Sequence, residues 1–340
     1  MKQTTYHQAD QIKQLVDKAQ RIVILQADNP DADSLGSALA LEQILHELGK
    51  EPFLYCGIDM PSYLKYLAGW DRVDNELPIG FDLSIIVDTS TLTLFERLIK
   101  AGGQSWVGSK PCIILDHHEE VGNPIPFATV TINDPGVSST GELIYRLGKQ
   151  LSWPLNLLAQ EFIMTAVLGD TQGLSNSLAS ASTYRIMADM VDEGVDRPKL
   201  EESRREYGKM SQSIFKYKAE LINRTEFYAD GRLAIVSVPQ NEINEFSPLY
   251  NPAPLIQGDM LQTENVGVAI VFKQYSDGRI TAAIRCNPLF HVGADLAEYF
   301  GGGGHLYASG FKVQDGRSFD NIKADCIRTA TELMDKLDNK

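Results

Sequence analysis

Residues 21–39 read RIVILQADNPDADSLGSAL, and the N-terminal half of the fold is organised around them. Residues 21–27 are an apolar run with the length of a buried strand. Leucines then recur at close to helical spacing until a glycine that can stop a helix: they are Leu35, Leu39, Leu45 and Leu48, before Gly49. A buried strand that leads directly into a helix is the repeating unit of an α/β fold.

The same alternation continues along the chain. Further strands are expected at residues 52–56, 83–87, 112–115 and 129–132, with helical stretches between several of them. We therefore predict an α/β fold with a doubly wound, mostly parallel sheet over residues 1–196. Sheets of this kind place their chemistry at the carboxyl ends of the strands, so the residues just after 27, 87, 115 and 132 matter most.

Three more helices are expected before the composition changes. Ser139 and Glu142 fit a capping box that opens a helix to about Leu151. Residues 155–169 and 183–193 are the other two. Residues 197–224 hold eight Lys/Arg and four Asp/Glu, and we predict a helical linker there. Residues 225–340 then predict a second, smaller α/β domain, with a hairpin at the turn signal Asp277-Gly278.

Composition excludes several classes of protein. The chain has 340 residues with a net charge of −14, which argues against binding long duplex nucleic acid because that requires a basic surface. The four cysteines contain no CxxC pair, so a zinc ribbon or a dense disulfide scaffold is not expected. Residues 155–168 are too short and too polar to span a bilayer. These features predict a cytoplasmic protein without a membrane segment.

Acidic side chains gather where the strands are predicted to end. Four carboxylates and an imidazole in one crevice would repel one another or hold protons unless cations lay between them. Oxygen donors with one or two nitrogens suit Mn²⁺ or Mg²⁺ better than a zinc site built on cysteine. Singly, each has an ordinary alternative, such as a helix N-cap for Asp31 or Asp33, a turn for Asp88, or a core imidazole for His117. The residues that follow strands are Asp28, Asp31, Asp33, Asp88, Asp116, His117 and His118, while Asp170 follows the helix expected at residues 155–169.

At these positions the sequence resembles the DHH phosphoesterases. Four motifs match in order: Asn29-Pro30-Asp31-Ala32-Asp33, Val87-Asp88-Thr89-Ser90, Asp116-His117-His118 and Gly169-Asp170-Thr171. The run Gly301-Gly302-Gly303-Gly304-His305 resembles the signature of the DHH-associated C-terminal domain. The compact length is similar to the subgroup of nano-RNases and pAp phosphatases, and unlike the longer RecJ-type exonucleases.

The resemblance implies a site with two Mn²⁺ ions, with Mg²⁺ as an alternative. It implies that Asp88 bridges the two metals, that Asp33, His117 and Asp170 complete one site, and that Asp31 contributes to the other. His118 would lie beside the scissile phosphate, and Asp116 would orient an imidazole. Substrate-binding positions carried over in the same way are Ser138, Ser139, Arg285, Gly302, Gly303, Gly304 and His305.

One position departs from the family pattern. A histidine that ligates one metal normally stands three residues before the motif proline, and here that residue is Ala27. Gln26 and Asp28 flank it, and neighbours in a strand point to opposite sides. Asp28 could replace the imidazole only if the turn is rearranged. We therefore expect weaker metal binding at the position that contains Asp31.

The sequence leaves several functions open. The first is hydrolysis of short oligoribonucleotides or linear dinucleotides such as pApA to mononucleotides, with pAp and cyclic dinucleotides as further candidates. Pyrophosphate or polyphosphate would be different substrates for the same chemistry. A nucleotide-binding relative with weak or no catalysis is the alternative that Ala27 supports. A DNA exonuclease would need a basic groove that the sequence lacks. The resemblance also implies a homodimer.

Overall fold

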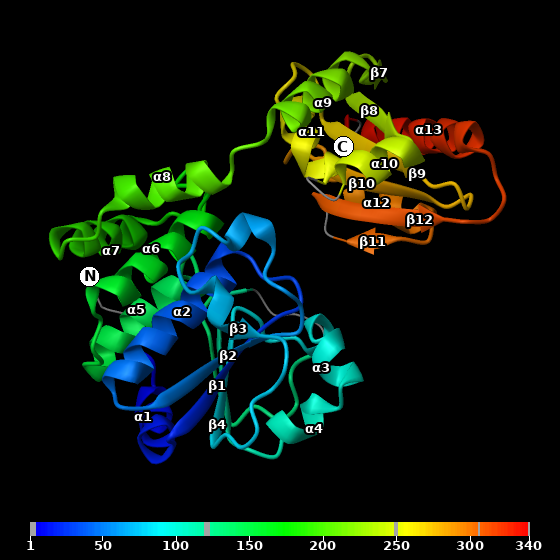
Figure 1. The fold of residues 1–340 in the computed structure, drawn as a ribbon. Coiled ribbons are helices and arrows are strands. Elements are labelled where there is room, and N and C mark those ends of the chain that lie inside the picture. Colours follow the sequence, from blue (N-terminus) through cyan, green and yellow to red (C-terminus); the bar gives the residue numbers. More distant parts are fainter. Residues whose placement is uncertain (1–4, 119–122, 248–250, 305–306, 339–340) are drawn as a thin grey trace. The chain divides into compact units, whose positions relative to one another are not determined.

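The computed structural model describes residues 5–118, 123–247, 251–304 and 307–338. The chain divides into two compact units, Met1–Lys209 and Met210–Lys340. Each unit contains its own six-stranded sheet (Figure 1). Within the described residues, no helix is long and apolar enough to cross a membrane. All four cysteines are buried free thiols.

The first unit is built on a sheet with the strand order β3-β2-β1-β4-β5-β6. Every strand pair in it is parallel, which confirms the predicted doubly wound α/β fold. The strand order reverses between β1 and β4, so a crevice is expected above those two strands. The strands are β1 (Arg21–Gln26), β2 (Glu51–Cys56), β3 (Val73–Asp74), β4 (Leu83–Val87), β5 (Cys112–Asp116) and β6 (Val130–Asn133).

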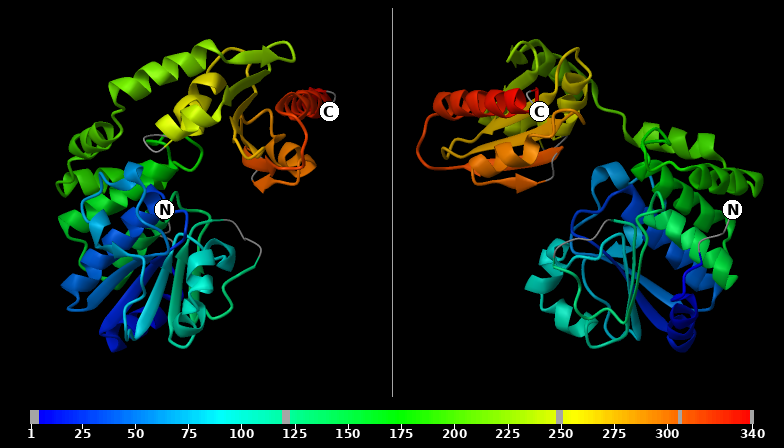
Figure 2. Two further views of the ribbon diagram at one scale, coloured as in Figure 1. Left: turned by 45° about the vertical axis from the view of Figure 1, so that its right-hand side comes forward. Right: turned by 180° about the vertical axis from the view of Figure 1, so that it is seen from behind.

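Helices cover both faces of this sheet, as the views in Figures 1 and 2 show. On one face lie α2 (Ala32–Glu47), α5 (Thr140–Leu151) and α6 (Leu157–Asp170), and on the other α3 (Glu96–Lys100) and α4 (Gly103–Val107). Strand β1 is buried from both sides, with Ile22 and Ile24 in one core and Val23 and Leu25 in the other. Burial on both faces explains why this strand is a continuous apolar run.

The predicted linker, residues 197–224, consists of two helices. Helix α8 (Arg197–Tyr207) has no buried residue and falls in the first unit. Helix α9 (Gln212–Asn223) buries Ile214, Tyr217 and Leu221 in a core of the second unit. The other helices of the first unit are α1 (Ala9–Lys18) and α7 (Ala181–Asp192), with the short 3-10 turns η1 (Ser62–Leu64), η2 (Trp70–Arg72) and η3 (Leu92–Leu94).

The second unit has the strand order β11-β12-β10-β9-β8-β7. Strands β8 and β9 are parallel and the other pairs are antiparallel, so this is a mixed sheet. The predicted hairpin is present between β9 and β10. The strands are β7 (Glu226–Tyr228), β8 (Leu233–Val238), β9 (Val268–Gln274), β10 (Ile280–Cys286), β11 (Gly303–Gly304) and β12 (Ala308–Val313). The helices are α9, α10 (Gln240–Phe246), α11 (Pro252–Leu261), α12 (Gly293–Tyr299) and α13 (Phe319–Asp338).

Candidate metal centre

Four of the predicted ligands meet at the carboxyl ends of the central strands. Asp33 lies in the first turn of α2, Asp88 follows β4, His117 follows β5, and Asp170 ends α6. The His117 Nε2 atom is 2.9 Å from Asp170 Oδ2, 3.5 Å from Asp33 Oδ2 and 3.7 Å from Asp88 Oδ1. Within the described residues this nitrogen makes no hydrogen bond of normal geometry despite the short distances. The ligand atoms of Asp33, His117 and Asp170 lie within 4.8 Å of one another, close enough to hold one cation.

The start of helix α5 holds the Asp33 carboxylate in place. The backbone N–H groups of Thr140 and Gly141 donate to Oδ2 and Oδ1 of Asp33 at 2.7 and 3.0 Å. Ser37 Oγ donates to Asp33 Oδ1 at 2.9 Å. The N-terminus of a helix carries unpaired N–H groups and a partial positive charge, which stabilises a carboxylate. Asp33 is thus oriented from both α2 and α5.

Asp88 is positioned by its backbone and by Thr140. Its φ of 63° lies in the left-handed region, which is uncommon for a residue other than glycine. The Asp88 N–H still donates to Leu115 O at 2.9 Å, so the turn begins directly at the end of the sheet. Thr140 Oγ1 donates to Asp88 Oδ1 at 3.2 Å. Sequence reasoning placed Thr140 only at a helix start and missed this contact with a site carboxylate.

Burial and like charges make this cluster hold protons. Burial and the neighbouring Asp170 raise the pKa of Asp33 to about 6. Burial and Asp33 raise the pKa of Asp88 well above its usual range. Burial acts to lower the pKa of His117, but Asp170 and Asp33 overcome it and raise that pKa to about 9. A divalent cation would relieve the same repulsion by replacing those protons.

Asp116 orients the two histidines that follow it. Its Oδ1 accepts hydrogen bonds from His117 N at 2.8 Å and from His118 N at 3.2 Å. It also lies 2.8 Å from His118 Nδ1. Burial acts to raise the pKa of Asp116, but the hydrogen bond from His118 lowers it, and the same bond raises the pKa of His118. An ionised carboxylate only accepts, so Nδ1 donates to Asp116, and the His118 side chain is half exposed.

The donor set fits a divalent cation. Two groups of potential ligand atoms occur among the described residues: Asp33, His117 and Asp170, and separately Asp88, His117 and His118. Three carboxylates with one imidazole are typical of Mn²⁺ or Mg²⁺ rather than of a cysteine-based zinc site. The first group, with Asp88 beside it, defines the better built position.

The second predicted position is poorly supplied with ligands. Asp31 caps helix α2, and its Oδ1 accepts from the N–H groups of Asp33 and Ser34, both at 3.0 Å. Ala27 is 5% exposed, and Asp28 Oδ2 accepts from Arg97 N at 2.8 Å, so Asp28 is directed towards α3. Gln26 is fully buried, and its amide has no hydrogen-bond partner among the described residues. The other carboxylate oxygen of Asp28, Oδ1, is likewise buried without a hydrogen-bond partner among the described residues.

Ser138 and Ser139 form hydrogen bonds at the start of α5. Both are fully buried. Ser139 Oγ accepts from Glu142 N and caps α5, as predicted, but the Glu142 carboxylate does not complete a capping box. It accepts instead from Ser138 N at 3.2 Å and from Ser138 Oγ. Both hydroxyls thus contribute to the start of α5, and their assignment to substrate binding stays a prediction.

The predicted substrate residues of the second unit lie on and beside two strands. Arg285 is exposed on β10, and its NH1 donates to the backbone oxygen of Ile284 at 3.0 Å. A Cβ on Gly302 would lie 2.2 Å from Gly310 O, and one on Gly304 would lie 2.6 Å from Ser309 Cα. The close approach of β11 to β12 therefore requires glycine at both positions. Gly303 is exposed, and His305 lies outside the described residues.

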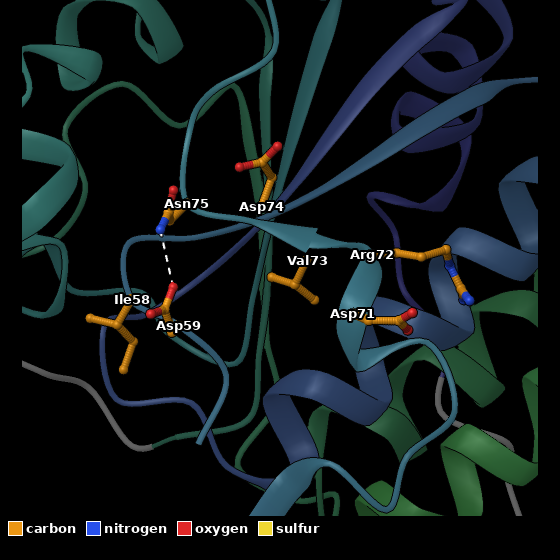
Figure 3. Close-up of a pocket in the computed structure, with 7 residues that line it drawn as sticks. All are labelled: Ile58, Asp59, Asp71, Arg72, Val73, Asp74 and Asn75. Atoms are coloured by element: carbon orange, nitrogen blue, oxygen red, sulfur yellow. Dashed lines mark hydrogen bonds between the residues drawn. The ribbon is translucent and has the colours of Figure 1, made fainter. Parts of the chain in front are cut away.

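Figure 3 shows a hollow of about 310 Å³ that contains none of the predicted site residues. It lies beside the edge strand β3. Asn75 Nδ2 donates to Asp59 Oδ1 across it at 3.1 Å, while the Arg72 guanidinium is turned away and binds Glu42. The lining residues are Ile58, Asp59, Asp71, Arg72, Val73, Asp74 and Asn75.

Residues 21–169 match the family model described as DHH family, N-terminal domain. The chain therefore contains a DHH family domain, and the predicted resemblance is confirmed. It is 26% identical over 309 residues to the bifunctional oligoribonuclease and PAP phosphatase NrnA of Bacillus subtilis, covering 89% of this chain and 93% of that protein. It is 23% identical to the cyclic-di-AMP phosphodiesterase GdpP of the same organism, covering 87% of this chain and 45% of that protein.

The fold of the whole chain also has a solved counterpart. An exopolyphosphatase-related protein from Bacteroides fragilis superposes with a TM-score of 0.82. The two chains are 23% identical, and the match covers 96% of this chain and 97% of the other. This likeness supports the two-unit α/β architecture.

Proposed function

We propose that this protein is a Mn²⁺-dependent phosphodiesterase that hydrolyses linear dinucleotides and short oligoribonucleotides to mononucleotides. The observation that carries the proposal is the convergence of Asp33, Asp88, His117 and Asp170 at the strand-order switch of the sheet. NrnA, an oligoribonuclease and PAP phosphatase by name, matches over nearly its full length. We include pAp and cyclic dinucleotides as candidate substrates, and Mg²⁺ as an alternative metal.

Each residue would have a definite task in this reaction. When bound, divalent cations supply charge neutralisation at the phosphate and lower the pKa of the attacking water. Asp33, His117 and Asp170 would hold one cation, and Asp88 would face both positions. Asp116 keeps the two histidines in orientation. The half-exposed His118 imidazole would donate a proton or hydrogen bond from Nε2 to the phosphate or to the leaving oxygen, and the raised pKa of this imidazole favours its charged form.

A Mn²⁺-dependent hydrolysis panel tests the proposal. The substrates are pApA, pAp, cyclic di-AMP, a five-nucleotide RNA and pyrophosphate, with products separated by chromatography. We expect mononucleotides from pApA and from the RNA. Asp88→Asn should reduce the rate by at least about a hundredfold because it removes charge shared by both metal positions. Asp71→Asn, the same change at an exposed carboxylate of the hollow in Figure 3, should leave the rate unchanged. Phosphate release from pyrophosphate alone would contradict the proposal.

The second candidate function is nucleotide binding with weak or no turnover. The alanine at position 27, where the family pattern has a metal-ligating histidine, favours it. The discriminating experiment compares the native chain with Ala27→His in Mn²⁺ titrations and in turnover. Binding of pApA without turnover by the native chain, and turnover by Ala27→His, would support the binding protein. We expect turnover by the native chain, with one tight and one weaker Mn²⁺. Two equally tight sites would show that Ala27 has no effect on the second position.

Two further parts of the proposal concern the cellular compartment and the oligomeric state. Four buried free thiols suit a reducing compartment, so we place the activity in the cytoplasm. We also propose a homodimer, which light scattering on the purified chain would test.

A further inference from the structure

Tyr63 presents an aromatic ring that is rigidly held yet open to solvent. It lies in the short turn η1, next to Leu64, which is buried in the core. At its other end the Tyr63 hydroxyl donates to the backbone oxygen of Pro30 at 2.8 Å. The residue nevertheless remains 60% exposed. The ring is therefore fixed through its backbone and through its hydroxyl, while much of its surface is uncovered.

The hydroxyl anchor places this ring beside the metal centre. Pro30 directly precedes Asp31, and the same loop continues to Asp33 in the first turn of α2. Partial burial and the charge of Asp31 raise the pKa of Tyr63, which agrees with a short distance between the two side chains. Tyr63 is thus attached to the loop that carries two of the predicted ligands.

Within the described residues, the Tyr63 ring is not a member of any hydrophobic cluster. Its hydroxyl is already satisfied by Pro30, so it is not available for proton transfer. Its exposed surface is not part of the hydrophobic core described around Leu64. An open aromatic face beside a site for phosphate chemistry suits the flat surface of a nucleobase, and stacking of this kind tolerates any base.

We propose that the ring of Tyr63 is a stacking platform for one base of the nucleotide whose phosphate reaches the metal centre. The proposal rests on the proposed function and adds a base subsite to the first unit. The hydroxyl bond to Pro30 would fix the ring before the substrate arrives, which reduces the entropy lost on binding.

Two substrates that differ only in a base test this subsite. One is a dinucleotide, and the other is its analogue with a single base replaced by hydrogen, prepared for each position in turn. Tyr63→Ala should raise the KM of the complete dinucleotide roughly five- to hundredfold, the range expected for losing one base–aromatic stack. Its KM for one of the two analogues should stay within about twofold of the native value, because that analogue has no base to stack. Tyr63→Phe keeps the ring and should change either KM only slightly.

A binding measurement separates this inference from catalysis. A dinucleotide that carries 2-aminopurine at the stacked position should lose fluorescence on binding to the native chain and to Tyr63→Phe, but not to Tyr63→Ala. Trp106→Ala is the matched control, because Trp106 is also an exposed aromatic residue. It lies in α4, shortly before the start of β5, and so at the opposite edge of the sheet from the carboxyl ends that carry the metal centre. Thermal unfolding of each variant verifies that it is folded, and Tyr63→Leu replaces Tyr63→Ala if the latter is not.

The outcomes are distinct. Equal effects of Tyr63→Ala on the dinucleotide and on both analogues, or no effect on any of them, would overturn the base subsite. A native chain that quenches 2-aminopurine through Tyr63 but hydrolyses no dinucleotide would refute the proposed activity while keeping the subsite. Hydrolysis of the dinucleotide without any Tyr63-dependent quenching would refute the base subsite and support the proposed activity.

Discussion

At the scale of single residues, the metal centre is a set of groups that compete for protons. Asp33 and Asp88 are buried carboxyls with raised pKa values, and His117 has its pKa raised to about 9 by the carboxylates around it. Each of these groups must lose its proton before it can bind a cation. Protons and a cation therefore compete for the same side chains, so the metal affinity of this cluster depends on pH.

We predict that Mn²⁺ binding becomes tighter as the pH rises from about 6 to about 9. At pH 7 the His117 imidazole, with a pKa of about 9, still carries a proton that the metal must displace. Affinity should improve by about tenfold per pH unit for each proton displaced. Calorimetry in two buffers with different ionisation enthalpies counts these protons. An affinity that does not change between pH 6.5 and 8.5 would contradict this, and Asp88→Asn should release fewer protons than the native chain.

Single residues also show how far the sequence could predict the site. The strand-end rule located Asp33, Asp88 and His117 because carboxyl ends of parallel strands share one edge, whereas Asp170 ends a helix and was found only through the resemblance. The burial of Ser138 and Ser139 could not be predicted, because it depends on packing against distant segments. Thr140 was missed for a related reason. Its contact with Asp88 joins residues 52 apart in the chain, and local sequence contains no signal for it.

At the scale of elements, the start of α5 is the part on which the centre depends. Glu142 connects it to the rest of the unit: Thr183 of α7 donates to Glu142 Oε2 at 2.9 Å, and Arg146 Nε donates to Oε1 at 3.0 Å. Glu142 is fully buried. The sequence predicted this helix and its serine cap. It also predicted that the Glu142 carboxylate would accept a hydrogen bond from the backbone N–H of Ser139, as in a capping box. The tertiary contacts with Ser138, Thr183 and Arg146 override that local preference.

We predict that Glu142→Gln destabilises the first unit and weakens its metal binding. The change removes the negative charge of Glu142 from beside the partly buried Arg146, which costs about 3 kcal/mol and lowers Tm by roughly 6–12 °C. Because α5 holds Asp33 and Asp88, Mn²⁺ affinity should fall by about tenfold. Calorimetry on folded protein, well below Tm, separates the two effects.

The matched control for this prediction is Glu96→Gln. It makes the same chemical change in an exposed pair with Lys100 and should alter stability by less than about 0.5 kcal/mol. A Glu142→Gln variant with native metal affinity would show that α5 does not set the geometry of the centre.

At the scale of the whole molecule, the chain consists of two units with separate cores. Among the described residues, Val195 is the last buried member of the hydrophobic clusters of the first unit. Ile214 is the first buried member of the clusters of the second unit. The sequence predicted both α/β halves and a helical connection, because strand and helix periodicities are local. The division of that connection between the units could not be predicted, since it depends on which core buries α9.

We predict that limited trypsin digestion cuts first between α8 and α9. Lys209 is exposed there, outside any helix, and cleavage after it gives fragments Met1–Lys209 and Met210–Lys340. Each fragment keeps a complete sheet, so each should retain its secondary structure by circular dichroism and unfold cooperatively. Mass spectrometry identifies the cut. Early cleavage within either sheet, or fragments that are unfolded, would contradict two independent units.

The hydrogen bonds that orient Asp33 have a consequence for how such a site can change over time. Two of its three donors are main-chain N–H groups, which every residue except proline provides. The orientation of this ligand is thus inherited with the helix itself. The two residues that supply the donors are nevertheless constrained, because the Thr140 hydroxyl also bonds Asp88 and a Cβ on Gly141 would lie 2.5 Å from Ala166 Cβ.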